Sequence, residues 1–251
     1  MKTFIVPKGF IQGRFLPTVV YVRETVDFHT RLCLFNYFSE LFPDIKTGAK
    51  AYLWFFNSKG ALVASREIPL AYQGQLQFDL SLLGVQFEGT AGVSIVPDTE
   101  PSAAHNRLVG TGYYVYYYDD EHHSDASHEW EPMQFLKSTS IPWLCVVRPL
   151  LFPQTEIIVM NAYYGEDAGE GSAHWHIALR NEQGSILAEK EMPSLLPKAS
   201  TRFLLKDAFP DIEKIAQHEK HIGVEVKGTN IQGPFTFVRA ENGDFNIHHF
   251  C

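Results

Sequence analysis

Two histidines separated by a single residue give the sequence its clearest metal-binding pattern. His174 and His176 flank Trp175. On a β-strand, residues i and i+2 project from the same face, so both imidazoles can point toward one metal ion. Further histidines that can supply a third ligand are His122, His123, His128, His248 and His249. The pattern allows either a divalent metal such as zinc or two histidines exposed on a strand.

A run of tyrosines from Tyr113 to Tyr118, interrupted only by Val115, is the most unusual aromatic stretch. Alternation along a strand separates Tyr113 and Tyr117 from Tyr114, Tyr116 and Tyr118. Aromatic rings of this kind stack on sugars or pack against another protein surface. We therefore treat Tyr113 and Tyr117 as candidate ligand-binding residues.

Familiar catalytic motifs are absent from the sequence. There is no GxSxG nucleophile turn, phosphate-binding loop, HExxH helix or dinucleotide fingerprint. The acidic and histidine-rich segment 119–125 follows a predicted strand, and runs of this kind are usually solvated loops. The sequence favours a protein that is not an enzyme.

The sequence pattern of the elements that must position these residues occurs twice in the chain. The run PTVVYVR from Pro17 is matched by PWLCVVR from Pro142, an offset of 125 residues. Blocks ending at Asn36 and Asn161 follow, then blocks ending at Pro69 and Pro193. A fourth pair begins at Gly92 and Gly223, and a fifth at Gly112 and Gly233. Five blocks in the same order indicate an internal duplication.

Three polar residue types recur in both copies. The pairs are Arg23 with Arg148, Asn36 with Asn161, and His128 with His249. In a structural interpretation, Arg bridges strands, Asn satisfies a bent backbone and His fixes the terminal segment. In a functional interpretation, each set of three lines a pocket for a carboxylate or for sugar hydroxyls. We expect each His to lie near the Arg and Asn of its own copy.

The duplication also tests the other candidates. His174 and His176 align with Lys50 and Tyr52, which are ordinary outward-facing types. Tyr114 and Tyr116 align with Phe235 and Phe237, so we expect these two tyrosines to face the core. Cys33 and Cys145 align with Ile158 and Val20, which predicts that both thiols fill apolar space.

Each copy reads as a series of short strands. Asn57 to Gly60 and Asn181 to Gly184 separate apolar runs, as in hairpin loops that need a glycine with positive φ. Only Leu204 to Gln217 has a helical pattern, and Pro210 interrupts it. We predict an all-β protein of two tandem homologous β-sandwich domains that form a pseudo-dimer. The predicted boundaries are 1–128, a linker at 129–141, and 142–251.

Two stretches resemble the sensory rhodopsin transducer family. They are Gly9-Phe10-Ile11 and the segment from His29 to Asn36. The resemblance covers about the first hundred residues and implies a sandwich fold with a non-enzymatic, oligomeric role. This chain departs from the family pattern, since Leu70 and Ala71 follow Pro69 in place of paired arginines. It is also duplicated, whereas family members carry a single copy.

Composition narrows the choice of partner. The net charge of −8 disfavours nucleic acid and anionic membranes. No apolar run is long enough to cross a bilayer, and three cysteines without a CxxC pair fit a cytoplasmic setting. We expect a binding or assembly module for a small molecule, carbohydrate or protein, with no cofactor, and possible homo-oligomers. The alternative is a metal-dependent enzyme built on His174 and His176.

Overall fold

The computed structural model describes residues 17–38, 44, 46–99, 112–122, 130–133, 135–165, 169–219, 221–239 and 245–250. The elements in the first half are β1 (Thr18–Glu24), β2 (His29–Phe35), β3 (Ala49–Asn57), β4 (Leu62–Leu70), β5 (Gln75–Asp79), the 3₁₀-helix η1 (Leu80–Leu83), β6 (Phe87–Pro97), β7 (Tyr113–Tyr118) and β8 (Trp130–Pro132). Those in the second half are β9 (Ile141–Val147), β10 (Glu156–Asn161), β11 (Ala173–Arg180), β12 (Ile186–Leu195), β13 (Ser200–Leu204), α3 (Leu205–Ala208), α4 (Ile212–Ala216), β14 (Ile222–Gly228), β15 (Ile231–Arg239) and β16 (Phe245–His249). The protein is all-β, as predicted.

The two halves have the same strand order. In the first half, a large sheet β4-β3-β6-β1-β8 faces a small sheet β5-β2-β7. In the second half, the large sheet is β12-β11-β14-β9 and the small sheet is β13-β10-β15-β16. Apart from β8 and β16, each strand of one half occupies the place of its counterpart in the other. This identity of order is what an internal duplication predicts.

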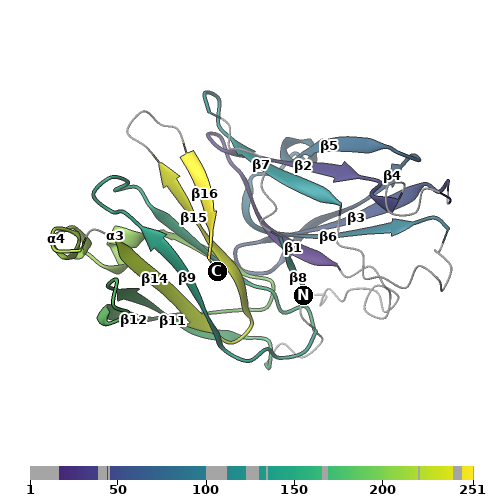
Figure 1. Ribbon diagram of the computed structural model, residues 1–251. Helices are drawn as coiled ribbons and strands as arrows, with labels where there is room; N and C mark the ends of the chain where they lie inside the picture. The colour runs from purple at the N-terminus through teal and green to yellow at the C-terminus, as the bar shows by residue number, and fades with distance from the viewer. Residues whose placement is uncertain are drawn as a thin grey trace.

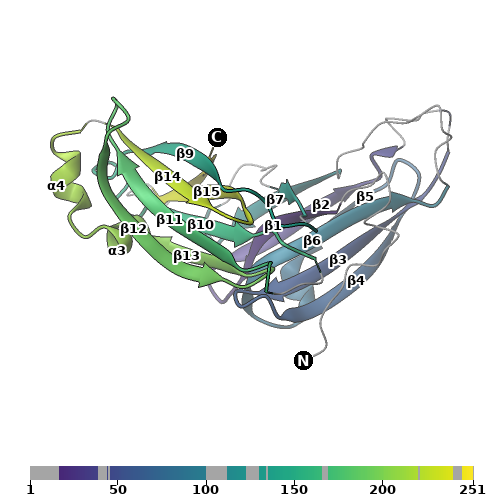
Figure 2. The same ribbon diagram turned by 90° about the horizontal axis from the view of Figure 1, so that it is seen from below.

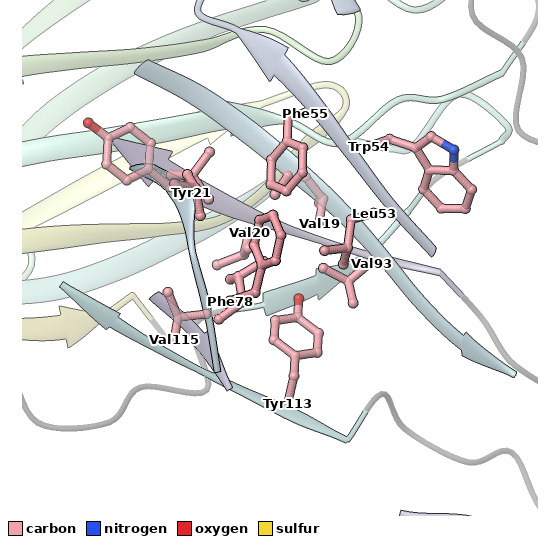
Figure 3. Close-up of a cluster of buried hydrophobic side chains, with 14 of the residues drawn as sticks. Val19, Val20, Tyr21, Leu53, Trp54, Phe55, Phe78, Val93, Tyr113 and Val115 are labelled. Carbon is pink, nitrogen blue, oxygen red and sulfur yellow. The ribbon is translucent and has the colours of Figure 1, made fainter. Parts of the chain in front are cut away.

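The first sandwich is filled by large aliphatic and aromatic side chains from both sheets. Val20 of β1 and Phe55 of β3 point inward from the large sheet, and Phe78 of β5 meets them from the small sheet. The rings of Phe55 and Phe78 stack with centroids 5.9 Å apart. Trp54 points away from this group, as strand alternation requires (Figure 3).

The second sandwich has its own core and a short helical connection. Ile157, Ile177 and Val224 are buried between its sheets. Helices α3 and α4 flank Pro210, in agreement with the short, interrupted helix predicted there. They lie at the end of this sandwich that is distant from the first one (Figures 1 and 2).

Matching hydrogen bonds hold the same corner in both sandwiches. Asn36 Nδ2 donates to the carbonyls of Thr47 and Ala71, at 2.8 and 2.9 Å. Asn161 Nδ2 donates to the carbonyls of Gly171 and Leu195, at 2.7 and 3.0 Å. In each case the amide ties the end of a small-sheet strand to segments flanking the hairpin β3–β4 or β11–β12. The structural interpretation of this Asn pair is thus what the geometry supports.

The predicted hairpin loops are also equivalent. Gly60 and Gly184 have φ of 77° and 82°, the left-handed region that glycine tolerates best. Asn57 Oδ1 accepts backbone N–H bonds from residues 59 and 61. Asn181 Oδ1 accepts the corresponding bonds from residues 183 and 185.

One register inferred from sequence is wrong by two residues. Leu53 of β3 faces Val93 of β6, whereas its counterpart Ile177 faces Val226 of β14. Val93 therefore corresponds to Val226, and Gly92 does not correspond to Gly223. A two-residue slip keeps the same side chains inward, so the apolar pattern does not reveal it. Within the predicted linker, residues 130–132 form β8, which pairs with β1.

The two sandwiches pack side by side (Figures 1 and 2). The outer face of the first large sheet meets the outer face of the second small sheet. Tyr21 of β1 contacts Phe235 of β15, with ring centroids 5.7 Å apart. Phe56 of β3 contacts Tyr164, which follows β10, at 5.5 Å. Because non-equivalent faces meet, the contact between the two copies is heterologous and lacks the two-fold symmetry of an isologous dimer.

Candidate docking surface

The repeated polar residues do not line one pocket in the first sandwich. Arg23 lies beside the turn between β1 and β2, where its guanidinium stacks over the Phe28 ring at 4.6 Å. Its backbone N–H and carbonyl both bond to Thr30 Oγ1. Asn36 lies past the opposite end of β2. The length of a strand therefore separates the two.

The second sandwich keeps its corresponding residues apart as well. Arg148 follows β9 and is exposed, whereas Asn161 is buried at the far end of β10. His128 lies outside the described residues. His249 ends β16, where its backbone pairs with Phe235, and its side chain is outside the described part of the structure. The expected Arg–Asn–His grouping is not assembled by the residues that can be placed.

The two faces of the tyrosine strand are the reverse of the sequence expectation. Tyr113 and Tyr117 are buried in the first sandwich, whereas Tyr114 and Tyr116 are only half-buried on its outer face. Tyr113 OH bonds to Thr18 Oγ1 at 3.0 Å, and Tyr117 OH donates to the carbonyl of Tyr21 at 2.8 Å.

The prediction that Tyr114 and Tyr116 face the core is wrong for a physical reason. Their counterparts Phe235 and Phe237 are apolar because they are buried against the first sandwich, not within their own. The apolar character of these two counterparts therefore reflects the contact between the sandwiches, and it does not indicate that Tyr114 and Tyr116 face their own core. Tyr113 and Tyr117, with their hydroxyls bonded internally, leave no ring face for a ligand to stack on.

The two candidate metal ligands share one face of β11, as predicted. His174 is exposed and His176 is half-buried between Glu191 of β12 and Lys227 of β14. Across the described ranges, no group of three or more His, Cys, Asp or Glu side chains is placed to hold a metal ion. The described residues do not complete a metal site, and the metal hypothesis stays a prediction.

A different surface stands out when the large sheets are compared. We call the outer face of β1, β3 and β6 the covered face, because the second sandwich lies on it. Thr90 Oγ1 of β6 donates to the carbonyl of Lys198 at 2.9 Å. Glu88 receives two hydrogen bonds from Arg202 of β13, which also binds Glu156. Aromatic packing in the centre and an ion pair at the side fasten this contact.

The ion pair at the covered face determines the charge state of its members. Burial alone would lower the pKa of Arg202, but hydrogen bonds and charges from Glu88 and Glu156 outweigh burial and raise that pKa. Burial, followed by the negative charge of Glu88, raises the pKa of Tyr21 well above its usual value. Arg202 is therefore charged and Tyr21 neutral at physiological pH.

In the described part of the structure, the same face of the second sandwich is exposed along β9. We call the outer face of β9, β14 and β11 the open face. Val19 and Tyr21 of β1 are fully buried, whereas their counterparts Leu144 and Val146 of β9 are 44% and 66% exposed. Leu150 and Leu151, in the turn after β9, are also exposed. Four large apolar side chains on a strand and its adjoining turn form the kind of patch that marks an interaction site.

The open face is hollowed on either side of His221. One hollow of about 300 Å³ is lined by Leu144, Val146, Arg180 and Gly223, with residues of the β11–β12 loop. A second, of about 250 Å³, is lined by Arg148, Leu150, Leu151 and Glu219. Because His221 lines both, the two hollows adjoin.

Polar groups border the apolar strip. Arg180 of β11 forms a two-pronged ion pair with Glu225 of β14, at 3.0 and 3.1 Å. His221 Nδ1 lies 3.1 Å from Glu182 Oε1. The open face therefore combines an apolar strip with polar groups that already have partners in the described structure.

Edge exposure adds to the accessibility of this surface. Within the described structure, β1 is paired on both sides, by β6 and β8, whereas β9 pairs only with β14. Edge strands with free backbone groups are common sites of association.

Sequence reasoning missed this surface. The sequence analysis predicts that PTVVYVR and PWLCVVR form equivalent strands, and in the structure they do. The available signal was the run Leu150-Leu151-Phe152, which continues apolar character into a turn where polar residues are usual.

Comparisons with known proteins do not identify the chain. No family model and no curated protein matches it, so the resemblance to sensory rhodopsin transducers stays a prediction. A glycosyl hydrolase family 2 member from Bacteroides cellulosilyticus matches at 11% identity and a TM-score of 0.22, over 93% of this chain and 26% of that one. An FMN-binding beta-glucuronidase from Facaelibacterium prausnitzii L2-6 matches at 8% identity and a TM-score of 0.21, over 93% and 31%. This chain spans a third or less of those proteins, and such low TM-scores support no argument about it.

Among the described residues, no helix has the length and apolar character needed to cross a membrane.

Proposed function

We propose that the chain is a non-enzymatic binding and assembly module that docks a protein partner on the open face. The observation that carries this proposal is the contrast at one strand position. Tyr21 is fully buried under a neighbouring sheet, and its counterpart Val146 is 66% exposed. Within the chain, the covered face binds a neighbouring sheet. The open face is the equivalent surface of the second sandwich, and none of the described residues packs on it.

The internal contact suggests the chemistry of the partner. The covered face binds an apolar sheet surface that presents Phe235 and Phe237 and an arginine at its side. We infer that the open face takes a partner of the same kind, a sheet surface with projecting aromatic side chains. Burial of Leu144 and Val146 would supply the main stabilisation, at about 25 cal/mol for each Å² of apolar surface removed from water.

A protein partner is favoured over a carbohydrate or small molecule. Sugar binding depends on exposed aromatic rings. The rings that the sequence offered for this purpose, Tyr113 and Tyr117, are both buried. The open face instead presents aliphatic side chains along an edge strand, which suits a protein surface.

Site-specific photocrosslinking tests this function. A benzophenone amino acid replaces Val146 in one protein and Leu196 in another, since Leu196 is 57% exposed in a turn at the opposite edge of the sheet. In an extract of cells that make the protein naturally, we expect a discrete adduct from position 146 only. The adduct should disappear when Leu144→Asp is added. Equal adducts at both positions, an adduct that survives Leu144→Asp, or none at position 146 would overturn the proposal.

A further inference from the structure

We propose that the partner on the open face is a second copy of this chain, which docks through the outer face of β5, β2 and β7. This inference rests on the proposed function and names the partner for the same surface. In this proposal, two molecules meet through the equivalents of the two faces that already meet within one molecule.

Both halves of such a contact are present on every copy. Inside the chain, the second small sheet presents an apolar outer face to the covered face. The residues at its centre are Ile158, Met160, Phe235 and Phe237. Strand pairing assigns them the counterparts Cys33, Phe35, Tyr114 and Tyr116 on the first small sheet. The first small sheet therefore carries an apolar and aromatic outer face at the same positions.

The outer face of the first small sheet is partly exposed, unlike that of the second small sheet. Phe35, Tyr114 and Tyr116 remain partly exposed, whereas their counterparts are buried against the first sandwich. The Phe35 and Tyr114 rings meet edge to face at 5.4 Å, which holds them in place on the surface. Each molecule thus has one uncovered large-sheet face and one aromatic small-sheet face with partial exposure.

Side-chain sizes are compatible with the repeated contact. At the covered face, the bulky Tyr21 meets Phe235. At the open face, the smaller Val146 lines a hollow of about 300 Å³, and Tyr114 would take the place of Phe235. Tyr exceeds Phe by a single hydroxyl oxygen, and the hollow beside the smaller Val146 leaves room for this ring.

The polar groups are compatible as well. The ion pair between Glu88 and Arg202 has His221 and Gln77 as its counterparts. Both can donate and accept hydrogen bonds, so they can pair across the contact without leaving a buried charge. Beside them on the open face, Arg180 and Glu225 neutralise each other.

The contact joins different faces, so it leaves each complex with one free face of each kind. Heterologous contacts close into rings or grow into open chains, and they do not stop at a two-fold dimer. This distinguishes the proposal from edge-to-edge pairing of β9 with β9 of another copy, which would stop at two.

Two single-face variants test the proposal by analytical ultracentrifugation. Val146→Asp blocks the open face, and Tyr116→Asp blocks the aromatic face. Circular dichroism first establishes that each variant folds, and Tyr116→Ser replaces Tyr116→Asp if the latter does not. Leu196→Asp serves as a matched control, since it adds the same charge at an exposed position outside both faces.

Head-to-tail docking predicts four results. Wild type and Leu196→Asp form species larger than dimers as concentration rises, and each single-face variant alone stays monomeric. An equimolar mixture of the two variants forms a dimer, because each supplies the face that the other lacks. Association of the mixture should be at least tenfold stronger than that of either variant alone.

Three outcomes would overturn the inference. They are a wild type that stays monomeric up to about 1 mM, a wild type that stops at a dimer, and a mixture that fails to associate. If the wild type is monomeric while position 146 still gives a Leu144-dependent adduct to another protein, the proposed function stands and the second copy is excluded as partner. If neither is seen, both fail.

Discussion

The large sheets of the two sandwiches have the same strand order and different surroundings. Tyr21 and Val146 occupy the same position, and both strands carry apolar side chains on both of their faces. One is buried because a neighbouring sheet lies on it, and the other is exposed because none of the described residues does. The pair shows that a strand's sequence fixes which side chains share a face, whereas the neighbouring sandwich decides whether that face is seen by solvent.

The same comparison distinguishes the frame of each sandwich, meaning the residues that hold its strands together, from the residues on its outer faces. Asn36 and Asn161 make the same pair of backbone bonds in both sandwiches, so the frame is common to both. The outer faces have diverged. Phe56 has become Arg180, and Thr90 has become Gly223. A face that a neighbouring sheet covers and a face that none of the described residues covers place different demands on their side chains.

The largest expected effect comes from placing a charge at each of the two matched positions. Tyr21→Asp puts an unpaired carboxylate in a buried contact beside Glu88, and it should lower the free energy of unfolding by more than about 3 kcal/mol. Val146→Asp should change it by less than about 0.5 kcal/mol. Urea denaturation at a protein concentration too low for association measures both. Similar costs at the two positions would contradict the assignment of covered and open faces.

The frame itself gives the next largest effect. Asn36→Ala leaves the carbonyls of Thr47 and Ala71 without their amide donor, and Asn161→Ala does the same to Gly171 and Leu195. Each should cost about 1–3 kcal/mol of unfolding free energy. Chemical denaturation of the two variants side by side checks that the costs agree. If one variant were as stable as wild type, the two corners would not be equivalent.

Local features of the fold could be predicted from sequence because they depend on nearby residues. The hairpin loops at Gly60 and Gly184 follow from Asn and Gly at fixed positions. The helix break follows from Pro210. The agreement in strand order between the two halves follows from the repeated sequence pattern, since two copies of one pattern fold alike.

The surface could not be predicted in the same way, because it depends on contacts distant in sequence. Phe235 and Phe237 look like core residues, and only the packed structure shows that their neighbours are Tyr21 and Tyr117. The grouping of Arg23 with Asn36 failed because their order along the chain does not show that they lie at opposite ends of a strand. Exposure of Leu144 and Val146 likewise depends on what lies above them.

Ion pairs on the two faces should differ in the same direction. Arg202→Ala leaves Glu88 and Glu156 close together without their shared cation, and we expect a loss of about 2 kcal/mol. Arg180→Ala removes a single pair with Glu225 on the open face, and we expect a loss below about 1 kcal/mol. Thermal unfolding by calorimetry compares them. A larger loss for Arg180→Ala would indicate that the open face is more tightly organised than the covered one.

The smallest effect concerns the candidate metal ligands. His174 is exposed, so His174→Ala should change the unfolding free energy by less than about 0.5 kcal/mol. Metal analysis of the purified protein before and after the substitution tests the competing enzyme hypothesis. Stoichiometric zinc in the wild type that is lost from the variant would favour a metal site at His174 and His176 over a docking surface.

Intermolecular disulfide trapping tests the equivalence of the two faces most directly. Within the chain Tyr21 contacts Phe235, so Val146 of one copy should contact Tyr114 of another. Val146→Cys and Tyr114→Cys are made in separate proteins that both carry Cys33→Ala and Cys251→Ser, because Cys33 faces residue 114 on the neighbouring strand. The two proteins are oxidised alone and together. The docking account predicts a disulfide-linked pair only in the mixture, joining residue 146 to residue 114. Pairs that join residue 146 to residue 146, or no linked product in the mixture, would contradict it.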